Sequence, residues 1–234
     1  MTNDPKPTRA SAFRGVIFDM DGVLCDSERF ICEAAIRMFA ECYQRTVAPE
    51  DFVPFVGMGE NRYLGGVAEK HGIPLDIDLA KRRTYALYLN LIRGRLQPLP
   101  GALEFIPRCR HAGLLLAVAS SADRVKLFGN LKEIGLPPAT FDATVNGLEV
   151  TRKKPAPDIF LLAAERIGVS AGECLVVEDA PSGLRAGKAA GARCLGLTTS
   201  FPAPTLREAG ADWVGRDLAD VPPDLVAGLR LSAA

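Results

Sequence analysis

The sequence predicts an α/β fold: a Rossmann-like, three-layer α/β/α core with a parallel sheet, plus an inserted all-helical cap domain. In the second half of the chain, short apolar runs typical of buried strands alternate with segments of helical periodicity. Such alternation gives a parallel sheet with helices on both faces. Residues 29–93 contain no convincing buried strand, and this break in the alternation predicts the cap.

Each expected element follows from its own pattern. Five apolar runs are the expected strands, at residues 15–19, 114–120, 144–146, 174–178 and 194–197. Helical patterns cover residues 101–111, 123–134, 157–167 and 181–190 in the core, and residues 29–43, 60–71 and 77–92 in the insert. Ligands bind beyond the carboxyl ends of parallel strands. The insert follows the first strand, so we expect it to cover that edge of the sheet as a lid.

The chain therefore divides into three expected parts: an N-terminal tail at residues 1–13, a core at residues 14–28 and 94–234, and a cap at residues 29–93. The tail is polar and lacks the apolar run of a secretory signal. A transit peptide is the alternative interpretation of its few basic residues. The region after Trp213 is rich in Ala, Leu and Pro and carries no pattern that predicts an element.

Composition argues against several classes of partner. Hydrophobic residues make up 48% and charged residues 24% of the chain, which is typical of a soluble globular protein. The formal net charge is zero, so there is no electrostatic case for nucleic acid or an anionic membrane surface. Six cysteines show no C-x-x-C pair and no zinc spacing, which favours free thiols in a reducing compartment. We expect a monomer in the cytoplasm, or in an organelle stroma if the source is eukaryotic.

Two acids directly follow the first expected strand. Asp19 and Asp21 are two residues apart, so both side chains share one face, and Gly22 lets the backbone turn sharply after them. Crowded carboxylates at the end of a buried strand are unfavourable unless a positive group lies between them. This pattern predicts a divalent metal and phosphoryl transfer.

Polar residues follow three further strands in the same way. Ser120 and Ser121 end the second strand, Lys154 follows the third, and Glu178 and Asp179 end the fourth. Each residue alone is most often structural: a serine caps a helix, a lysine lies on the surface, and an acidic pair forms a solvated turn. Their order at successive strand ends is hard to explain by coincidence.

Each residue type suits a step of phosphoryl transfer. Asp19, nearest the buried strand, is the expected nucleophile that forms an aspartyl phosphate. Asp21 is the expected general acid and base, and crowding by other carboxylates is expected to raise its pKa and favour the protonated form. Lys154 holds the phosphate and the nucleophile together as a point charge, and Ser120 donates to phosphate oxygens.

The expected cofactor is Mg²⁺, a hard ion that keeps several waters and uses few protein ligands. Its expected ligands are Asp19, Asp21 through its backbone carbonyl, Glu178 and Asp179.

These residues resemble the four motifs of the haloacid dehalogenase superfamily, in members with a helical cap such as β-phosphoglucomutase and phosphoglycolate phosphatase. Asp19-Met20-Asp21-Gly22-Val23-Leu24 is similar to the first motif, Ser120 to the second, Lys154 to the third and Glu178-Asp179 to the fourth. The resemblance spans about residues 14–200. It implies a Rossmann-like core, a cap that opens and closes, Mg²⁺ dependence and an aspartyl-phosphate intermediate.

A narrower resemblance is carried by three stretches: Phe52-Val53-Pro54-Phe55, Leu64-Gly65-Gly66-Val67-Ala68 and Ser120-Ser121-Ala122-Asp123-Arg124. They are similar to the hydrolase-like domain of plant suppressor-of-quenching proteins and related phosphatases.

Departures from the family pattern narrow the expected activity. Sugar-phosphate mutases carry a His after the first motif and an Arg in the first cap loop, where this chain has Ile31 and Gly57-Met58-Gly59-Glu60. The dehalogenases lack the acid that matches Asp21. We therefore expect a phosphatase that acts on a small phosphorylated metabolite, a sugar phosphate or a phosphoglycolate-like acid. A phosphomutase and a non-catalytic binding or regulatory domain are the alternatives.

Substrate contacts are expected from Ser121 in the core and from Glu60, Asn61 and Arg82 in the cap. For the basic cap residues the competing interpretation is a solvated helix face. Ser27 is expected to cap the first cap helix.

Overall fold

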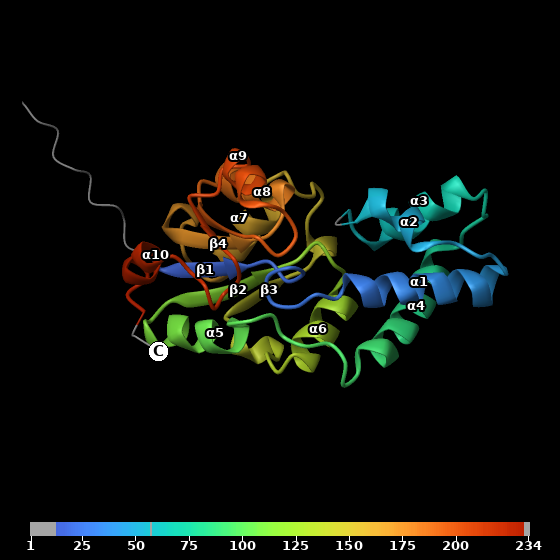
Figure 1. The fold of residues 1–234 in the computed structure, drawn as a ribbon, viewed down its shortest axis with the longest axis horizontal. Helices are drawn as coiled ribbons and strands as arrows, with labels where there is room; N and C mark the ends of the chain where they lie inside the picture. Colours follow the sequence, from blue (N-terminus) through green and yellow to red (C-terminus); the bar gives the residue numbers. More distant parts are fainter. Residues whose placement is uncertain (1–12, 57, 232–234) are drawn as a thin grey trace, which may run out of the picture.

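The structure, a computed structural model, describes residues 13–56 and 58–231. A six-stranded sheet forms its centre, with strand order β3-β2-β1-β4-β5-β6 and every neighbouring pair parallel (Figure 1). The strands are β1 (Gly15–Phe18), β2 (Leu115–Ala119), β3 (Ala143–Val145), β4 (Cys174–Glu178), β5 (Arg193–Leu197) and β6 (Trp213–Gly215). This topology confirms the predicted Rossmann-like α/β core.

The sixth strand was not predicted from the sequence. Trp213–Gly215 is only three residues long, pairs with β5 at the edge of the sheet and is half-buried over most of its length. A strand of this kind has no apolar run that would reveal it.

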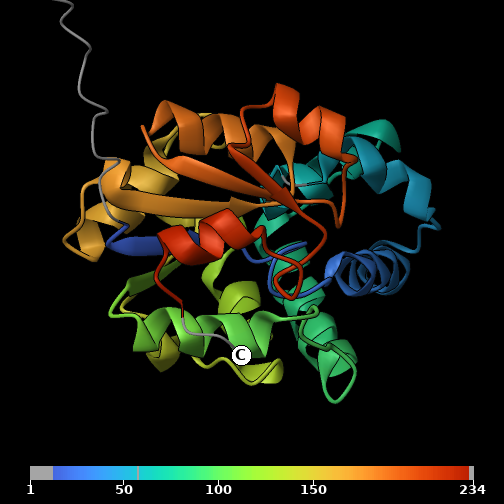
Figure 2. The same ribbon diagram turned by 60° about the vertical axis from the view of Figure 1, so that its left-hand side comes forward.

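Side chains of alternate strand residues contribute to two separate apolar layers, one on each face of the sheet. Phe18 and Val177 belong to the layer that also contains Phe105 and Leu131, whereas Ile17 and Val176 belong to the other. Figure 2 shows helices above and below the sheet. The first face is covered by α5 (Ala102–His111), α6 (Arg124–Glu133) and α10 (Pro223–Gly228), and the second by α7 (Asp158–Arg166), α8 (Pro181–Ala189) and α9 (Ala203–Glu208).

The insert between β1 and α5 is helical in its described residues and extends from one end of the core (Figure 1). Aromatic rings join its helices: Phe52 lies 6.3 Å from Phe39 and 4.9 Å from Tyr63, between ring centroids. The short helix α2 was not predicted. The four helices are α1 (Glu28–Tyr43), α2 (Pro49–Phe52), α3 (Glu60–Lys70) and α4 (Ile77–Ile92).

The chain leaves the core and re-enters it at adjacent positions. Cys25 forms an isolated bridge with Pro98, and the Leu99 N–H donates to the Leu24 carbonyl at 2.8 Å. The two connections to the insert therefore run side by side where the first strand has just ended.

Polar contacts seat the insert on the core. The Lys81 Nζ lies 2.5 Å from the Asp123 Oδ2, and the Glu60 Oε2 accepts the Asp123 backbone N–H at 3.3 Å. The Tyr88 hydroxyl donates to the Asn130 side chain, which lies on α6. Asp123 directly follows the loop after β2, so these contacts hold the insert against the carboxyl edge of the sheet.

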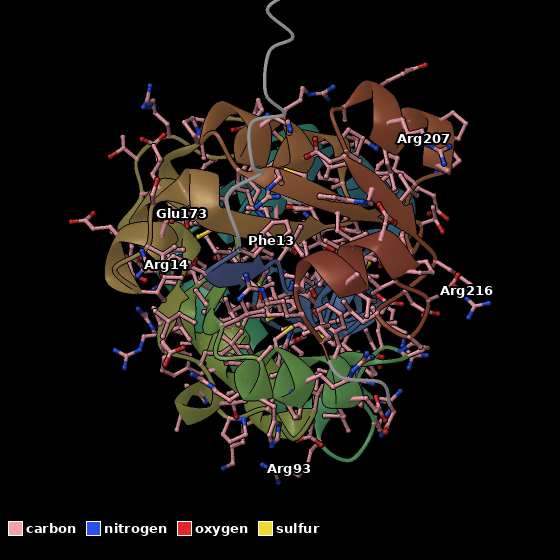
Figure 3. The ribbon with its side chains drawn as sticks, turned by 90° about the vertical axis from the view of Figure 1, so that its left-hand side faces the viewer. Phe13, Arg14, Arg93, Glu173, Arg207 and Arg216 are labelled. Atoms are coloured by element: carbon pink, nitrogen blue, oxygen red, sulfur yellow. The ribbon has the colours of Figure 1, made fainter. Side chains whose placement is uncertain are left out.

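The amino ends of the strands lie at the opposite end of the molecule, which Figure 3 views directly. There the Arg14 Nη1 lies 3.5 Å from the Glu173 Oε2, and the Phe13 ring lies 6.1 Å from the Trp213 ring. Phe13 is thus part of the core, whereas residues 1–12 of the expected tail lie outside the described residues.

Two further properties concern the cysteines and the length of the helices. All six cysteines are free thiols, and four of them are buried. No helix within residues 13–56 and 58–231 is long and apolar enough to span a bilayer.

Candidate active site

A buried ion-pair cluster lies at the carboxyl edge of the sheet. The Lys154 Nζ lies 2.5 Å from the Asp19 Oδ1 and 2.7 Å from the Glu178 Oε1. Asp19 and Glu178 follow or end the neighbouring strands β1 and β4, whose register pairs Phe18 with Val177. The sheet therefore fixes the two acids side by side, and residues far apart in sequence meet there as the motifs predict.

Glu178 is fully engaged by protein groups. Its Oε2 accepts the backbone N–H groups of Asp179 and Ala180, each at 2.9 Å, while its Oε1 receives Lys154. A Cβ on Gly183 would lie 1.6 Å from that Oε1, so only glycine leaves room for this carboxylate. The sequence predicted Glu178 as a metal ligand, which stays a prediction; in the structure its carboxylate contacts Lys154 and two backbone N–H groups.

Asp179 approaches the turn after the first strand very closely. A Cβ on Gly22 would lie 2.0 Å from the Asp179 Oδ2, and Gly22 has a φ of 77°. Glycine is therefore required here for two reasons, the left-handed backbone and the space that the carboxylate occupies. The Thr199 hydroxyl donates to the Gly22 carbonyl at 2.5 Å and tethers the turn to the end of β5.

Negative charge in the cluster exceeds the protein's own positive charge. Burial raises the pKa of Asp19 to about 7, against the opposing effect of Lys154. Burial, together with Glu178 and Asp19, raises the pKa of Asp179 to about 8. Three carboxylates with one ammonium are two positive charges short of balance, which fits a hard divalent cation with oxygen ligands.

The cluster is not a ready-made cage for an ion. Within the part of the chain that the structure describes, no group of three or more His, Cys, Asp or Glu side chains is arranged as a metal site. Mg²⁺ commonly keeps several waters and uses one or two carboxylates, so Asp19 and Asp179 with the Asp21 carbonyl suit it.

Asp21 is held by two groups that the sequence did not assign to it. The Ser27 hydroxyl donates to its Oδ1, and the Lys126 Nζ lies 3.0 Å from its Oδ2. Ser27 occupies the N-cap position of α1 as expected, but its side chain makes no cap hydrogen bond to that helix. The direct charged partner of the Asp21 side chain is a cation, where the sequence suggested crowding by carboxylates.

Lys126 lies on α6 and is buried, with a side chain only 6% exposed. Burial lowers its pKa, but Asp21 and Glu28 raise it more, so the pKa lies well above its usual value. Lys126 therefore stays charged. Its helix carries few apolar residues, and a lysine in such a helix is normally interpreted as solvent-exposed.

Ser120 and Ser121 lie at the end of β2, as predicted. The Ser120 side chain is buried, and its hydroxyl accepts the Ala122 N–H at 3.1 Å. The Ser121 carbonyl packs so closely on Gly147 that a Cβ there would lie 2.0 Å away. Both serines face the same cavity as the ion-pair cluster.

That cavity has a volume of about 760 Å³ and lies between core and cap. Glu60, predicted to contact substrate, lines it. Asn61 and Arg82 do not: both are exposed, and the Asn61 Oδ1 accepts from the Lys81 Nζ at 2.9 Å outside the cavity. The charged residues that line the cavity are Asp19, Asp21, Asp26, Glu28, Glu60, Lys126, Lys154, Glu178, Asp179 and Arg185.

Two further cavity residues, Glu28 and Tyr63, were not predicted. Glu28 begins α1, and burial raises its pKa. Tyr63 on α3 is buried, and burial raises the pKa of its hydroxyl. Their apolar and helical surroundings give no local signal, because they reach the cavity only through the packing of α1 and α3 on α4.

Comparison with known proteins places the chain in a family. A family model described as a haloacid dehalogenase-like hydrolase matches residues 13–191. The chain is 44% identical over 209 residues to Protein SUPPRESSOR OF QUENCHING 1, chloroplastic, from Arabidopsis thaliana. That match covers 88% of this chain but 20% of the plant protein, so the chain spans about a fifth of this relative's length.

Two further similarities cover nearly whole proteins. Phosphorylated carbohydrates phosphatase from Thermotoga maritima is 33% identical over 207 residues, which are 84% of this chain and 91% of that protein. The crystal structure of CbbY from Rhodobacter sphaeroides in complex with phosphate matches with a TM-score of 0.80 at 27% identity. The match covers 94% of this chain and all of that one.

These findings confirm the resemblance stated from the motifs, including the narrower one to the suppressor-of-quenching proteins. The family model bears out the predicted enzyme class at the level of a hydrolase. The chain belongs to the haloacid dehalogenase-like hydrolases.

Proposed function

We propose that the chain is a Mg²⁺-dependent phosphatase that hydrolyses a small phosphorylated metabolite through an aspartyl-phosphate intermediate. One observation carries this proposal: Asp19, Lys154 and Glu178 form a buried ion-pair cluster, with Asp179 beside it, in a cavity between core and cap. The relatives support the class of substrate, since one is named a phosphatase of phosphorylated carbohydrates and another binds phosphate.

In the first step Asp19 is the nucleophile. Lys154 contacts its Oδ1, which leaves the Oδ2 for attack on phosphorus. The phosphorus bond to the substrate's bridging oxygen breaks as the aspartyl phosphate forms, and Asp21 donates a proton to the departing alkoxide. Lys154 and the Ser120 hydroxyl neutralise and bind phosphate oxygens.

In the second step water replaces the aspartate. Asp21, now ionised and held by Ser27 and Lys126, accepts a proton from the water as its oxygen attacks phosphorus. The bond between phosphorus and the Asp19 oxygen breaks, and inorganic phosphate leaves with Asp19 and Asp21 restored.

Bound Mg²⁺ would supply charge neutralisation for the phosphoryl group. Asp19, Asp179 and the Asp21 backbone carbonyl are the groups that would hold it. Glu178 serves the site by orienting Lys154.

The alternatives are less well supported. A phosphomutase must hold a bisphosphorylated intermediate, but the cavity presents Ile31 and Glu60 at the positions where mutases of this family carry His and Arg. A non-catalytic domain need not keep Asp19, Asp21, Lys154 and Asp179 together. We propose the cytoplasm or an organelle stroma as its location, in line with the chloroplastic plant relative.

The test is phosphate release from a panel of phosphorylated metabolites and an aryl phosphate, with Mg²⁺ and with EDTA. We expect Mg²⁺-dependent turnover that Asp19→Asn reduces by at least about a thousandfold, since the variant removes the nucleophile. Thermal unfolding of the same preparations shows whether the variant stays folded and whether Mg²⁺ raises the melting temperature. Turnover retained by Asp19→Asn, or unaffected by EDTA, would reject the mechanism.

A further inference from the structure

The cavity is strongly acidic. Among the residues that line it, seven carry carboxylates and three carry cationic groups. All three cations belong to the core: Lys154 is paired with Asp19 and Glu178, and Arg185 lies on α8. The third, Lys126, is already paired with Asp21.

The cap contributes negative charge and no positive charge to this space. Its charged lining residues are Glu28 on α1 and Glu60 on α3, and among the described residues none of the arginines and lysines of α1 to α4 lines the cavity. Several of these cations are paired elsewhere: Arg37 with Glu33, Arg62 with Glu69, Lys70 with Asp51, Lys81 with Asp123, and Arg83 with Glu41.

Two buried polar groups lie next to each other on the same wall. Within the described part of the chain, the Glu28 Oε1 and the Tyr63 hydroxyl have almost no contact with solvent and no hydrogen bond of normal geometry, and each influences the pKa of the other. Both residues line the cavity. Buried groups of this kind are normally satisfied, and a ligand hydroxyl can donate to the carboxylate and accept from the tyrosine.

Resting on the proposed function, we propose that the alcohol released from the substrate is hydroxylated and carries no second phosphate or carboxylate. Glu28 and Tyr63 bind its hydroxyl groups at the cap end of the cavity. A second anion would be buried there against Glu28 and Glu60, where the nearby cation Lys126 is already paired with Asp21, and like charges brought together are strongly unfavourable. Sugar or polyol monophosphates fit this wall; phosphoglycolate and sugar bisphosphates do not.

Matched substrate pairs test this inference. 2-Hydroxyethyl phosphate and 2-phosphoglycolate differ by a hydroxymethyl group against a carboxylate, and fructose 1-phosphate differs from fructose 1,6-bisphosphate by one phosphate. With Mg²⁺ present, we expect kcat/KM to be at least about tenfold higher for the member without the second anion in each pair. The aryl phosphate reports the core chemistry separately.

Variants assign the discrimination to the cap. Glu28→Gln removes the charge and keeps the shape, so it should reduce the ratio within each pair by at least about threefold. Glu33→Gln, on the exposed side of the same helix, should leave the ratio unchanged. Tyr63→Phe removes the hydroxyl and should lower kcat/KM for 2-hydroxyethyl phosphate more than for 2-phosphoglycolate, which keeps the test decisive if Glu28→Gln does not fold.

Each outcome has one meaning. Equal or better turnover of the doubly anionic members, alongside normal aryl phosphate hydrolysis, would overturn this inference and leave the phosphatase function standing. Variant ratios that all match the wild type would overturn the role of Glu28 and Tyr63. No phosphate release from any probe would overturn the proposed function and this inference with it.

Discussion

Lys154 and Lys126 are buried ammonium groups in the same cavity, yet different parts of the molecule hold them. Lys154 pairs with Asp19 and Glu178, both positioned by adjacent strands of the sheet. Lys126 pairs with Asp21, and the cap residues Glu28 and Glu60 also raise its pKa. The core end of the cavity is therefore organised by the strands and loops of the core, whereas the cap end also depends on how the cap packs on the core.

The largest expected effect is at the core end. Lys154→Met removes the cation that holds Asp19 and would bind phosphate, so we expect kcat/KM to fall by about a thousandfold. Steady-state phosphate release measures it. Arg152→Met, which removes an exposed cation two residues away that pairs with Asp158, should be nearly neutral. A similar loss in both variants would mean that general charge, rather than the ion-pair cluster, is responsible.

The turn at Gly22 offers a second test of the core end. In Gly22→Ala the added Cβ would meet the Asp179 carboxylate, so we expect about a hundredfold loss of activity and a smaller rise in melting temperature with Mg²⁺. Gly94→Ala is the matched control: its φ of 67° imposes similar backbone strain, of about 1 kcal/mol, but nothing lies within 4 Å of the added Cβ. If the two variants behave alike, backbone strain explains the loss and the contact with Asp179 does not.

Lys126→Met tests the cap end. It leaves Asp21 and the cap acids without their cation, so we expect a loss of about 2 kcal/mol in the free energy of unfolding. This is below the usual figure for a buried pair because the Asp21 side chain is 30% exposed. Turnover should fall about tenfold, mainly in kcat, since Asp21 loses its partner. Lys132→Met, an exposed residue of the same helix, is the control, and equal melting curves for the two would contradict the buried role.

The smallest effect concerns a residue that the sequence predicted and the structure leaves outside the cavity. Arg82 is exposed on α4, so Arg82→Ala should change kcat/KM by no more than about twofold. Substrate titrations of the purified variant measure this. A large rise in KM would restore the prediction that Arg82 contacts substrate and would mean that the cap rearranges when substrate binds.

The two lysines also show which site residues could be predicted from the sequence. Asp19, Ser120, Lys154 and Asp179 follow strands whose apolar runs are visible, and parallel topology brings strand ends together. Lys126 meets Asp21 across 105 positions through helix packing, and nothing in its own segment indicates burial.

The same limit applies to Ser27, Glu28 and Tyr63. Ser27 has the local signature of a helix cap but donates to Asp21 instead, because tertiary contacts decide between two acceptors. Glu28 and Tyr63 reach the cavity only when α1 and α3 both pack on α4. Residues placed by one strand could be predicted, and those placed by the docking of several helices could not.

The paired connections at Cys25 and Pro98 have a consequence for how such an enzyme can change. Because the chain departs and returns at neighbouring, hydrogen-bonded positions, a foreign helical module grafted between them would not have to alter the spacing of the strands. Substrate selectivity can thus be exchanged without changing the residues that break the phosphate ester. Chimaeras joined at these two points are a direct route to new substrates on an unaltered catalytic core.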